Sequence, residues 1–250
     1  MEAAGLGTFM ISACLFGVLL EHPASTVRQG IDDAFTRRAL GGLAMGFTLI
    51  GIVFSPIGKR SGAHMNPAFT LTFLWLDKIR GWDACFYVAA QFAGGTLGVM
   101  AAYFALGGAL GDSHVNYVVT TPGPAGAPVA FFAEIIISFL MMLVVLYISN
   151  NKRLNRFTGI FAGALVAAYI TLEAPLSGMS MNPARTFGSA IAADFWPAAW
   201  IYFTAPLLGM FLAAMMYTRL RGARAVYCAK FHHENHHRCI FRCRYAELEA

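Results

Sequence analysis

Two short segments of this chain carry nearly the same run of residues. Residues 61–68 read Ser-Gly-Ala-His-Met-Asn-Pro-Ala and residues 177–184 read Ser-Gly-Met-Ser-Met-Asn-Pro-Ala, so six of eight positions are identical. Asn caps the free amides of a helix start, and Pro at the first helical position loses no hydrogen bond. The Asn side chain also has N–H groups to donate to a ligand. Each copy therefore predicts a helix N-terminus that presents amide donors.

The rest of the chain is dominated by long apolar runs. Of its 250 residues, 58% are apolar and 12% are charged, about half the charge of a typical soluble domain. A spanning helix needs roughly 20 apolar residues. Because lipid offers no hydrogen-bond partners to the backbone, runs of this length are interpreted as helices. Six stretches without Asp, Glu, Lys or Arg are candidates, at residues 3–20, 39–58, 84–111, 135–151, 157–172 and 195–218. The composition predicts an all-α integral membrane protein with six transmembrane helices.

The repeated segments divide these spans into two equivalent halves. Each half, about residues 1–110 and 129–218, reads span, span, motif, span. An odd number of spans per half inverts the second half relative to the first, which places a shared site near the bilayer midplane. The apolar runs that follow the motifs, residues 69–76 and 186–193, are too short to cross. They are expected as two re-entrant half-helices in an inverted repeat. An ordinary helix start would explain one copy, but two copies at matching places favour a pore.

The distribution of basic residues predicts how the chain is oriented. Fourteen of its Lys and Arg residues fall in loops and a tail on one side, which explains the net charge of +5 without a nucleic-acid partner. By the positive-inside rule, both termini of this multi-pass chain are expected in the cytoplasm, with the protein in the cell (inner or plasma) membrane. The first span starts almost at Met1 without a basic segment before it, so no cleavable signal peptide is expected.

Together these features resemble the aquaporin, or major intrinsic protein, family, in particular its bacterial-type water channels. The motifs that carry the resemblance are Asn66-Pro67-Ala68 and Asn182-Pro183-Ala184-Arg185, and the resemblance covers roughly residues 1–220. It implies an aquaporin fold over residues 1–218, a homotetramer in the lipid bilayer with one pore per subunit, and no required cofactor. The family pattern also implies that Glu134 holds loop carbonyls that line the pore, with Ser138 at the expected spacing, whereas Glu2 fits that pattern poorly.

The residues before each motif are expected to line this pore. Glycines allow the backbone to bend, so that the non-helical segments can direct carbonyls at the lumen. The pore-lining residues are predicted to be Gly62, Ala63, His64, Met65, Gly178, Ser180 and Met181. For His64, a purely structural hydrogen bond is the alternative. The family resemblance implies a constriction formed by Arg185, Met179, Ile170 and either Met45 or Gly46, depending on a one-residue insertion.

These residues favour passive water permeation that excludes protons. Asn66 and Asn182 can bind one water through its oxygen, which breaks a proton wire, and helix N-termini repel cations. An apolar constriction leaves glycerol, urea and ammonia as alternative solutes. A coupled secondary transporter also uses broken helices, but it would need more ionisable groups at the midplane. No nucleophile and base pair is apparent, so the chain is not expected to be an enzyme.

The tail, residues 219–250, lies outside the resemblance and has ligand types of its own. Cys and His residues three to five positions apart are typical of zinc sites. The candidates are Cys228, His232, His233, His236, His237, Cys239 and Cys243. The alternatives are a solvated basic tail whose aromatic residues contact the membrane surface, or a cloning remnant.

Overall fold

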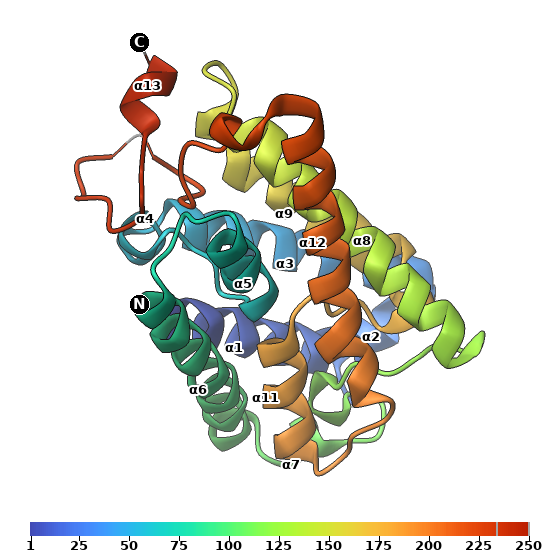
Figure 1. Ribbon diagram of the computed structural model, residues 1–250. Coiled ribbons are helices and arrows are strands. Elements are labelled where there is room, and N and C mark those ends of the chain that lie inside the picture. The colour runs from blue at the N-terminus through green and yellow to red at the C-terminus, as the bar shows by residue number, and fades with distance from the viewer. Residues whose placement is uncertain (234, 250) are drawn as a thin grey trace.

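The chain folds into a bundle of helices, seen in a computed structural model that describes residues 1–233 and 235–249 (Figure 1). These residues contain no strand. Within this described part of the chain, six helical stretches are long and apolar enough to cross a membrane, as the sequence predicts, and one of them, Asn155–Leu172, joins a short turn to α9. They are α1 (Glu2–Glu21), α3 (Ala34–Phe54), α6 (Gly81–Leu106), α8 (Gly126–Ser149), α9 (Thr158–Leu172) and α12 (Ala199–Arg221).

Two shorter helices begin at the Asn-Pro-Ala motifs. They are α5 (Pro67–Trp75) and α11 (Pro183–Ala193), preceded by the single turns α4 (Pro56–Ser61) and α10 (Ala174–Ser177). Asn66 caps α5 by accepting a hydrogen bond from the amide of Ala68 at 2.8 Å. Asn182 caps α11 in the same way, through the amides of Ala184 and Arg185. The two predicted half-helices are confirmed, and each starts at the Pro of its motif.

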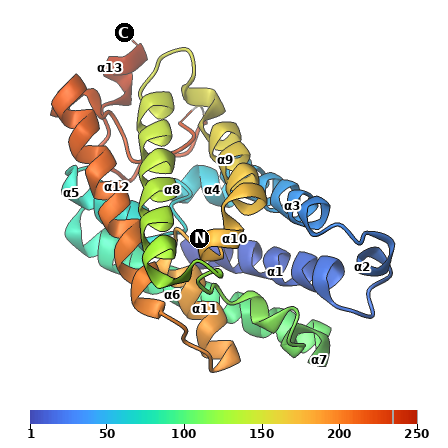
Figure 2. The same cartoon turned by 90° about the vertical axis from the view of Figure 1, so that its right-hand side faces the viewer.

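Short elements connect the spans and form the end of the chain. A C-terminal tail follows α12 and begins at Gly222. In Figure 2 this tail and α13 lie at one end of the molecule, the tail face, while α2 and α7 lie at the opposite face. The short elements are α2 (Thr26–Gly30), α7 (Gly108–Gly111), η1 (Asn116–Val118), η2 (Asn155–Phe157), η3 (Ala223–Ala225) and α13 (Tyr245–Glu249).

Equivalent helices of the two halves pack in equivalent ways. α1 packs along α6 and α8 packs along α12, side by side in Figure 2, while α3 and α9 join the halves. Small residues allow the closest crossings. A Cβ built on Gly46 would lie 2.6 Å from the carbonyl oxygen of Gly163, and one on Gly209 would lie 2.4 Å from that of Ile135. Each half-helix packs against the other half, α11 on α6 and α5 on α12.

On the face opposite the tail, the basic residue Arg37 finds its partners in the neighbouring loop and helix. Arg37 is almost fully buried and its Nε lies 3.2 Å from the carboxylate of Glu21. Its Nη1 donates to the carbonyls of Ile31 and Asp32, at 2.8 Å each. A buried charge needs such partners. Through these contacts Arg37 stabilises the conformation of the loop between α1 and α3.

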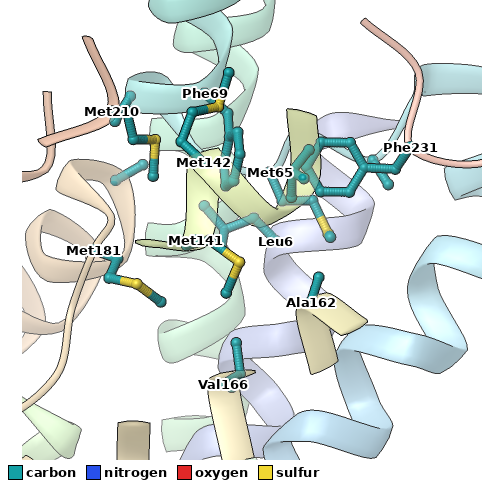
Figure 3. Close-up of a cluster of buried hydrophobic side chains, with 14 of the residues drawn as sticks. Leu6, Met65, Phe69, Met141, Met142, Ala162, Val166, Met181, Met210 and Phe231 are labelled. Carbon is teal, nitrogen blue, oxygen red and sulfur yellow. The ribbon is translucent and has the colours of Figure 1, made fainter. Parts of the chain in front are cut away.

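The interior is filled by apolar side chains from both halves and from the tail. Figure 3 shows ten of them labelled: Leu6, Met65, Phe69, Met141, Met142, Ala162, Val166, Met181, Met210 and Phe231. Phe231 points from the tail into this cluster. The tail therefore belongs to the same core as the spans.

Candidate functional site

The two half-helices meet through a reciprocal pair of hydrogen bonds. The side-chain Nδ2 of Asn66 donates to the carbonyl of Met181 at 2.7 Å. That of Asn182 donates to the carbonyl of Met65 at 2.8 Å. Each primary amide has two N–H groups, and each Asn also lines the central cavity. One donor of each amide thus joins the halves, and one is left for a molecule in the cavity.

The backbone before each motif adopts left-handed conformations at matching positions. Gly62 has φ +89° and Gly178 has φ +80°. Met65 and Met181 follow at φ +49° and +53°, values that cost energy for residues with a Cβ. These conformations persist because surrounding groups hold them.

In the second half, the carboxylate of Glu134 holds this backbone. It is fully buried and accepts hydrogen bonds from the amides of Ser180 and Met181, each at 2.7 Å. The hydroxyl of Ser177 donates to it at 2.8 Å. A buried carboxylate is expensive unless it has such donors. The hydroxyl of Ser138, four residues along α8, makes no hydrogen bond within the described part of the chain.

In the first half, Glu2 does the equivalent task, which the sequence spacing did not reveal. Its carboxylate accepts from the amides of His64 at 3.3 Å and Met65 at 2.5 Å. The side-chain amide of Gln91 donates to it at 2.7 Å and to the hydroxyl of Thr70 at 3.0 Å. The sequence signal is weak, because these partners lie 62 to 89 positions away.

A tyrosine supports each re-entrant segment from the neighbouring span. Tyr87 donates to the carbonyl of Ser61 and Tyr202 to that of Ser177, both at 2.6 Å. The two tyrosines lie at equivalent places on α6 and α12, so the inverted repeat includes these helices as well. Sequence reasoning identified neither of these contacts, because a tyrosine in an apolar span has no distinctive spacing.

A cavity of about 260 Å³ runs between the two halves. Met45, not Gly46, is on its wall, since Gly46 packs against Gly163. The other expected constriction residues, Ile170, Met179 and Arg185, also line it. The expected pore residues on the wall are Ala63, His64, Met65, Asn66, Gly178, Ser180, Met181 and Asn182. Gly62 and the Pro and Ala of each motif, Pro67, Ala68, Pro183 and Ala184, are not among the described residues that line it.

Arg185 is held in place by the loop between α6 and α8. Its Nη1 donates to the carbonyl of Val118 at 2.8 Å. Asn116, Tyr117 and Val118 have φ between +41° and +51°, an unusual run for residues other than glycine. The loop thereby directs a carbonyl at the guanidinium, whose remaining donors stay available to the cavity.

His64 lies at the tail end of the cavity and is almost fully buried. Its Nδ1 shares a hydrogen bond with the hydroxyl of Thr70 at 3.1 Å, and its Nε2 shares one with the carbonyl of Ala229 at 2.9 Å. Its ring is stacked between Phe73 and Phe241, at 5.2 and 5.3 Å between centroids. Both ring nitrogens of His64 thus make structural hydrogen bonds, as the alternative interpretation of the sequence foresaw.

The tail crosses this end of the molecule instead of extending into solvent. The amide of Phe231 donates to the carbonyl of Gly62 at 3.2 Å, so the tail covers a carbonyl that the sequence assigned to the lumen. The amide of Tyr227 donates to Asn150 at 2.7 Å, and the side chain of Asn155 donates to Tyr245. The described tail is therefore packed against both halves, unlike the solvated alternative.

Four side chains of the tail come together at one point. Cys228, His233, Cys239 and Cys243 each offer one ligand atom, and these atoms all lie within 4.8 Å of one another. This Cys/His cluster could hold a metal ion. Of the other candidates, His232 packs against Phe54, and His236 and His237 lie outside the cluster.

Two lysines beside the cluster are nearly buried. Lys78 is 7% exposed and Lys230 is 3% exposed. Burial lowers the pKa of both ammonium groups, while the nearby thiols oppose that effect. The Nζ of Lys230 donates to Asn235 at 3.0 Å.

The fold and site define a class: a multi-pass helical membrane protein with two re-entrant half-helices that meet at paired Asn side chains. The model of the major intrinsic protein family matches residues 3–217. This chain belongs to that family, the aquaporins.

Its relatives include plant aquaporins. Aquaporin NIP2-3 of Zea mays is 35% identical over 76% of this chain and 62% of the relative. Aquaporin NIP6-1 of Arabidopsis thaliana is 37% identical over 77% of this chain and 61% of the relative. The chain thus spans less than two thirds of the length of these relatives. The X-ray structure of the aquaglyceroporin from Plasmodium falciparum has the same fold, with a TM-score of 0.73 at 21% identity, covering 90% of this chain and 96% of that one.

Proposed function

We propose that this chain is a passive channel that conducts water and excludes protons and ions. The observation that carries the proposal is the crossed pair of Asn66 and Asn182, which line the cavity where the two half-helix N-termini meet. A water bound through its oxygen to both amides directs its hydrogens away from the centre. Such a water cannot accept and pass on a proton, and the partial positive charges of the helix ends repel cations.

The walls of the cavity support a channel over a coupled transporter. The ionisable residues among its described lining are Glu21, Arg37, Arg38, His64 and Arg185. Glu21 and Arg37 are paired with each other, and both ring nitrogens of His64 have partners. A carrier that couples to ions would need a free ionisable group near the crossed amides.

Small neutral solutes are a second candidate, favoured by the apolar constriction. Met45, Ile170 and Met179 have only apolar contact to give, opposite the donors of Arg185. A solute that enters must exchange its water hydrogen bonds for what the wall provides. Water needs few partners, whereas glycerol has three hydroxyls, so water should permeate best, with ammonia as a minor leak.

The decisive experiment is stopped-flow swelling of proteoliposomes in parallel gradients of water, glycerol and urea. We expect fast water flux with a low activation energy, slow glycerol flux and no need for an ion gradient. Asn182→Asp should admit cations or stop flow, because it puts a carboxylate at the helix N-termini. Glycerol flux near that of a dedicated glycerol channel, or unchanged conduction in Asn182→Asp, would contradict the proposal.

The proposal includes the setting of the channel. The basic residues of the tail face favour a cytoplasmic location for that face in the cell membrane. The family resemblance supports a homotetramer with one pore per subunit. Native mass spectrometry in detergent and protease access from each side of the membrane test these two points.

A further inference from the structure

The tail contributes a side chain, Phe231, to the end of the cavity nearest to it. Phe231 lines the cavity together with Met65 and Asn66. Its ring contacts Phe69 edge-on, with 5.1 Å between centroids, and its amide is bonded to the carbonyl of Gly62. An apolar side chain in this place gives water no hydrogen-bond partner. Phe231 therefore lies at the tail end of the path that the proposed function requires.

The segment that carries Phe231 has little structure of its own to keep it there. Between Val226 and Arg244, the described residues form no helix and no strand. Ordering such a segment costs backbone conformational entropy at every residue. Its buried side chains and few hydrogen bonds offset part of this cost, and a crosslink between distant positions would offset more.

The Cys/His cluster has the composition and spacing of such a crosslink. In a tetrahedral zinc site, Zn–S bonds of about 2.3 Å place ligand atoms about 3.8 Å apart. Here Cys228 Sγ and Cys239 Sγ are 3.5 Å apart, and His233 Nε2 and Cys243 Sγ are 3.0 Å apart. Three thiolates and one imidazole complete four coordination positions, the arrangement of a closed structural site.

The charge around the cluster fits a metal site of this kind. Three thiolates and one neutral imidazole around a divalent ion carry a net charge of −1. Lys78 and Lys230 are buried next to the cluster, since the carbonyl of Lys78 accepts from the amide of Arg242, beside Cys243, and Lys230 follows Cys228 by two positions. A buried ammonium group needs a negative partner. The metal-bound thiolates would provide one.

We propose that the Cys/His cluster binds one zinc-class divalent ion, and that the bound ion holds Phe231 across the cavity mouth and reduces permeation. The ion joins four positions of the tail on both sides of Phe231. It also fixes Phe241, whose ring stacks on His64 at the base of the first re-entrant segment. The effect on permeation rests on the proposed channel function, but the metal site does not.

The metal site is tested on the full chain, purified under reducing conditions without a metal-affinity tag. Elemental analysis should find about one zinc ion per chain, and Cys239→Ser or Cys243→Ser should weaken zinc binding by about tenfold or more. Two variants serve as matched controls and should keep the metal: Cys85→Ser, an exposed thiol on α6, and His236→Asn, an exposed tail histidine. Metal-free protein that takes up no added zinc, or a disulfide between Cys228 and Cys239 in its place, would overturn the site.

The closing role is tested by swelling of proteoliposomes with and without a membrane-permeant zinc chelator. Chelation and Cys243→Ser should each raise water permeability severalfold, and Cys85→Ser should behave as the parent protein. Phe231→Ala should raise permeability while it keeps its zinc, which separates obstruction from loss of folding. Bound zinc with permeability unaffected by chelation and by Phe231→Ala would overturn the closing role. Zinc binding without water flux in any variant would instead contradict the proposed function.

Discussion

The two halves of the chain share a scaffold but place different side chains three residues after each motif Asn. That residue is Phe69 in the first half and Arg185 in the second, and both line the cavity. Phe69 meets the ring of Phe231 from the tail, whereas Arg185 is bonded to the carbonyl of Val118. One end of the cavity is thus apolar and covered, and the other presents fixed donors and a permanent charge.

This comparison distinguishes the groups that shape the backbone from the groups that we expect to control selectivity. Glu2 and Glu134 hold the re-entrant backbones in the same way, and Tyr87 and Tyr202 support the same carbonyls. The repeated groups therefore shape the backbone. We expect the groups that break the repeat, Phe69 and Arg185, to determine what each end of the cavity does.

The largest effect should come from the carboxylate of the second half. Glu134→Gln replaces one acceptor oxygen by an N–H₂ group that faces amide donors. Charge-assisted hydrogen bonds contribute about 1.5 to 3 kcal/mol each, so with three of them the fold should lose several kcal/mol of stability. Thermal unfolding in detergent and water permeability both measure the loss.

Glu2→Gln is the matched variant, and it should be milder. The Oε1 of Gln91 has no hydrogen-bond partner within the described residues, so it can accept from the new amide. Equal losses in the two variants would contradict the idea that Gln91 gives the first half a reserve acceptor.

Replacement of Arg185, at the end of the cavity away from the tail, should mainly change selectivity. Arg185→Leu deletes the donors that glycerol needs and the charge that repels cations, so glycerol flux should fall further, and a cation barrier lower by roughly 1.4 kcal/mol would raise the potassium leak about tenfold. Phe69→Leu keeps an apolar wall and should leave the ratio of water to glycerol flux unchanged. Parallel swelling assays with a potassium leak measurement compare the two. A similar change in both variants would erase the proposed division between the ends.

The contact between the halves should tolerate no added methyl group. In Gly46→Ala, the new Cβ would meet the carbonyl oxygen of Gly163 at 2.6 Å, which should cost about 1 to 3 kcal/mol. Gly51→Ala on the same helix is the control. It has no atom within 4 Å of the added carbon, so the better helix propensity of Ala should leave stability equal or slightly higher. Unfolding temperatures in detergent decide between them.

The smallest effect is expected at the exposed ion pair between Arg242 and Asp77, which joins the tail to the first half. Exposed pairs contribute about 0 to 1 kcal/mol. Asp77→Asn should therefore leave water permeability close to that of the parent protein, in contrast to Phe231→Ala. A severalfold rise in Asp77→Asn would show that surface charge, not buried contact, holds the tail.

Much of this architecture follows from local signals in the sequence. Runs without charged residues predicted the six spans, since lipid imposes that pattern on any crossing helix. The doubled motif predicted the half-helices, because Asn and Pro specify a helix start by themselves. Arg185 was identified because it is attached to such a start.

The contacts that depend on tertiary structure escaped this reasoning. Glu2 was set aside because no partner lies at helical spacing, yet its partners reach it through the fold. The rotation of one helix places Met45 on the cavity wall and Gly46 against Gly163, and no local signal in the sequence fixes that rotation. The docking of Phe231 had no local signal, because an aromatic residue in a basic tail is equally compatible with solvent or lipid.

The crossed amides have a consequence for how the protein is made. Each motif Asn donates one hydrogen bond to a carbonyl more than 110 positions away, Asn66 to that of Met181 and Asn182 to that of Met65. During synthesis, the first re-entrant segment must wait in the membrane until most of the second half has emerged. Each half holds its own turn through Glu2 or Glu134, but neither half alone can make the crossed hydrogen bonds. Biogenesis of this protein is therefore a joint event late in translation, and two halves expressed as separate chains would have to find each other before either one matured.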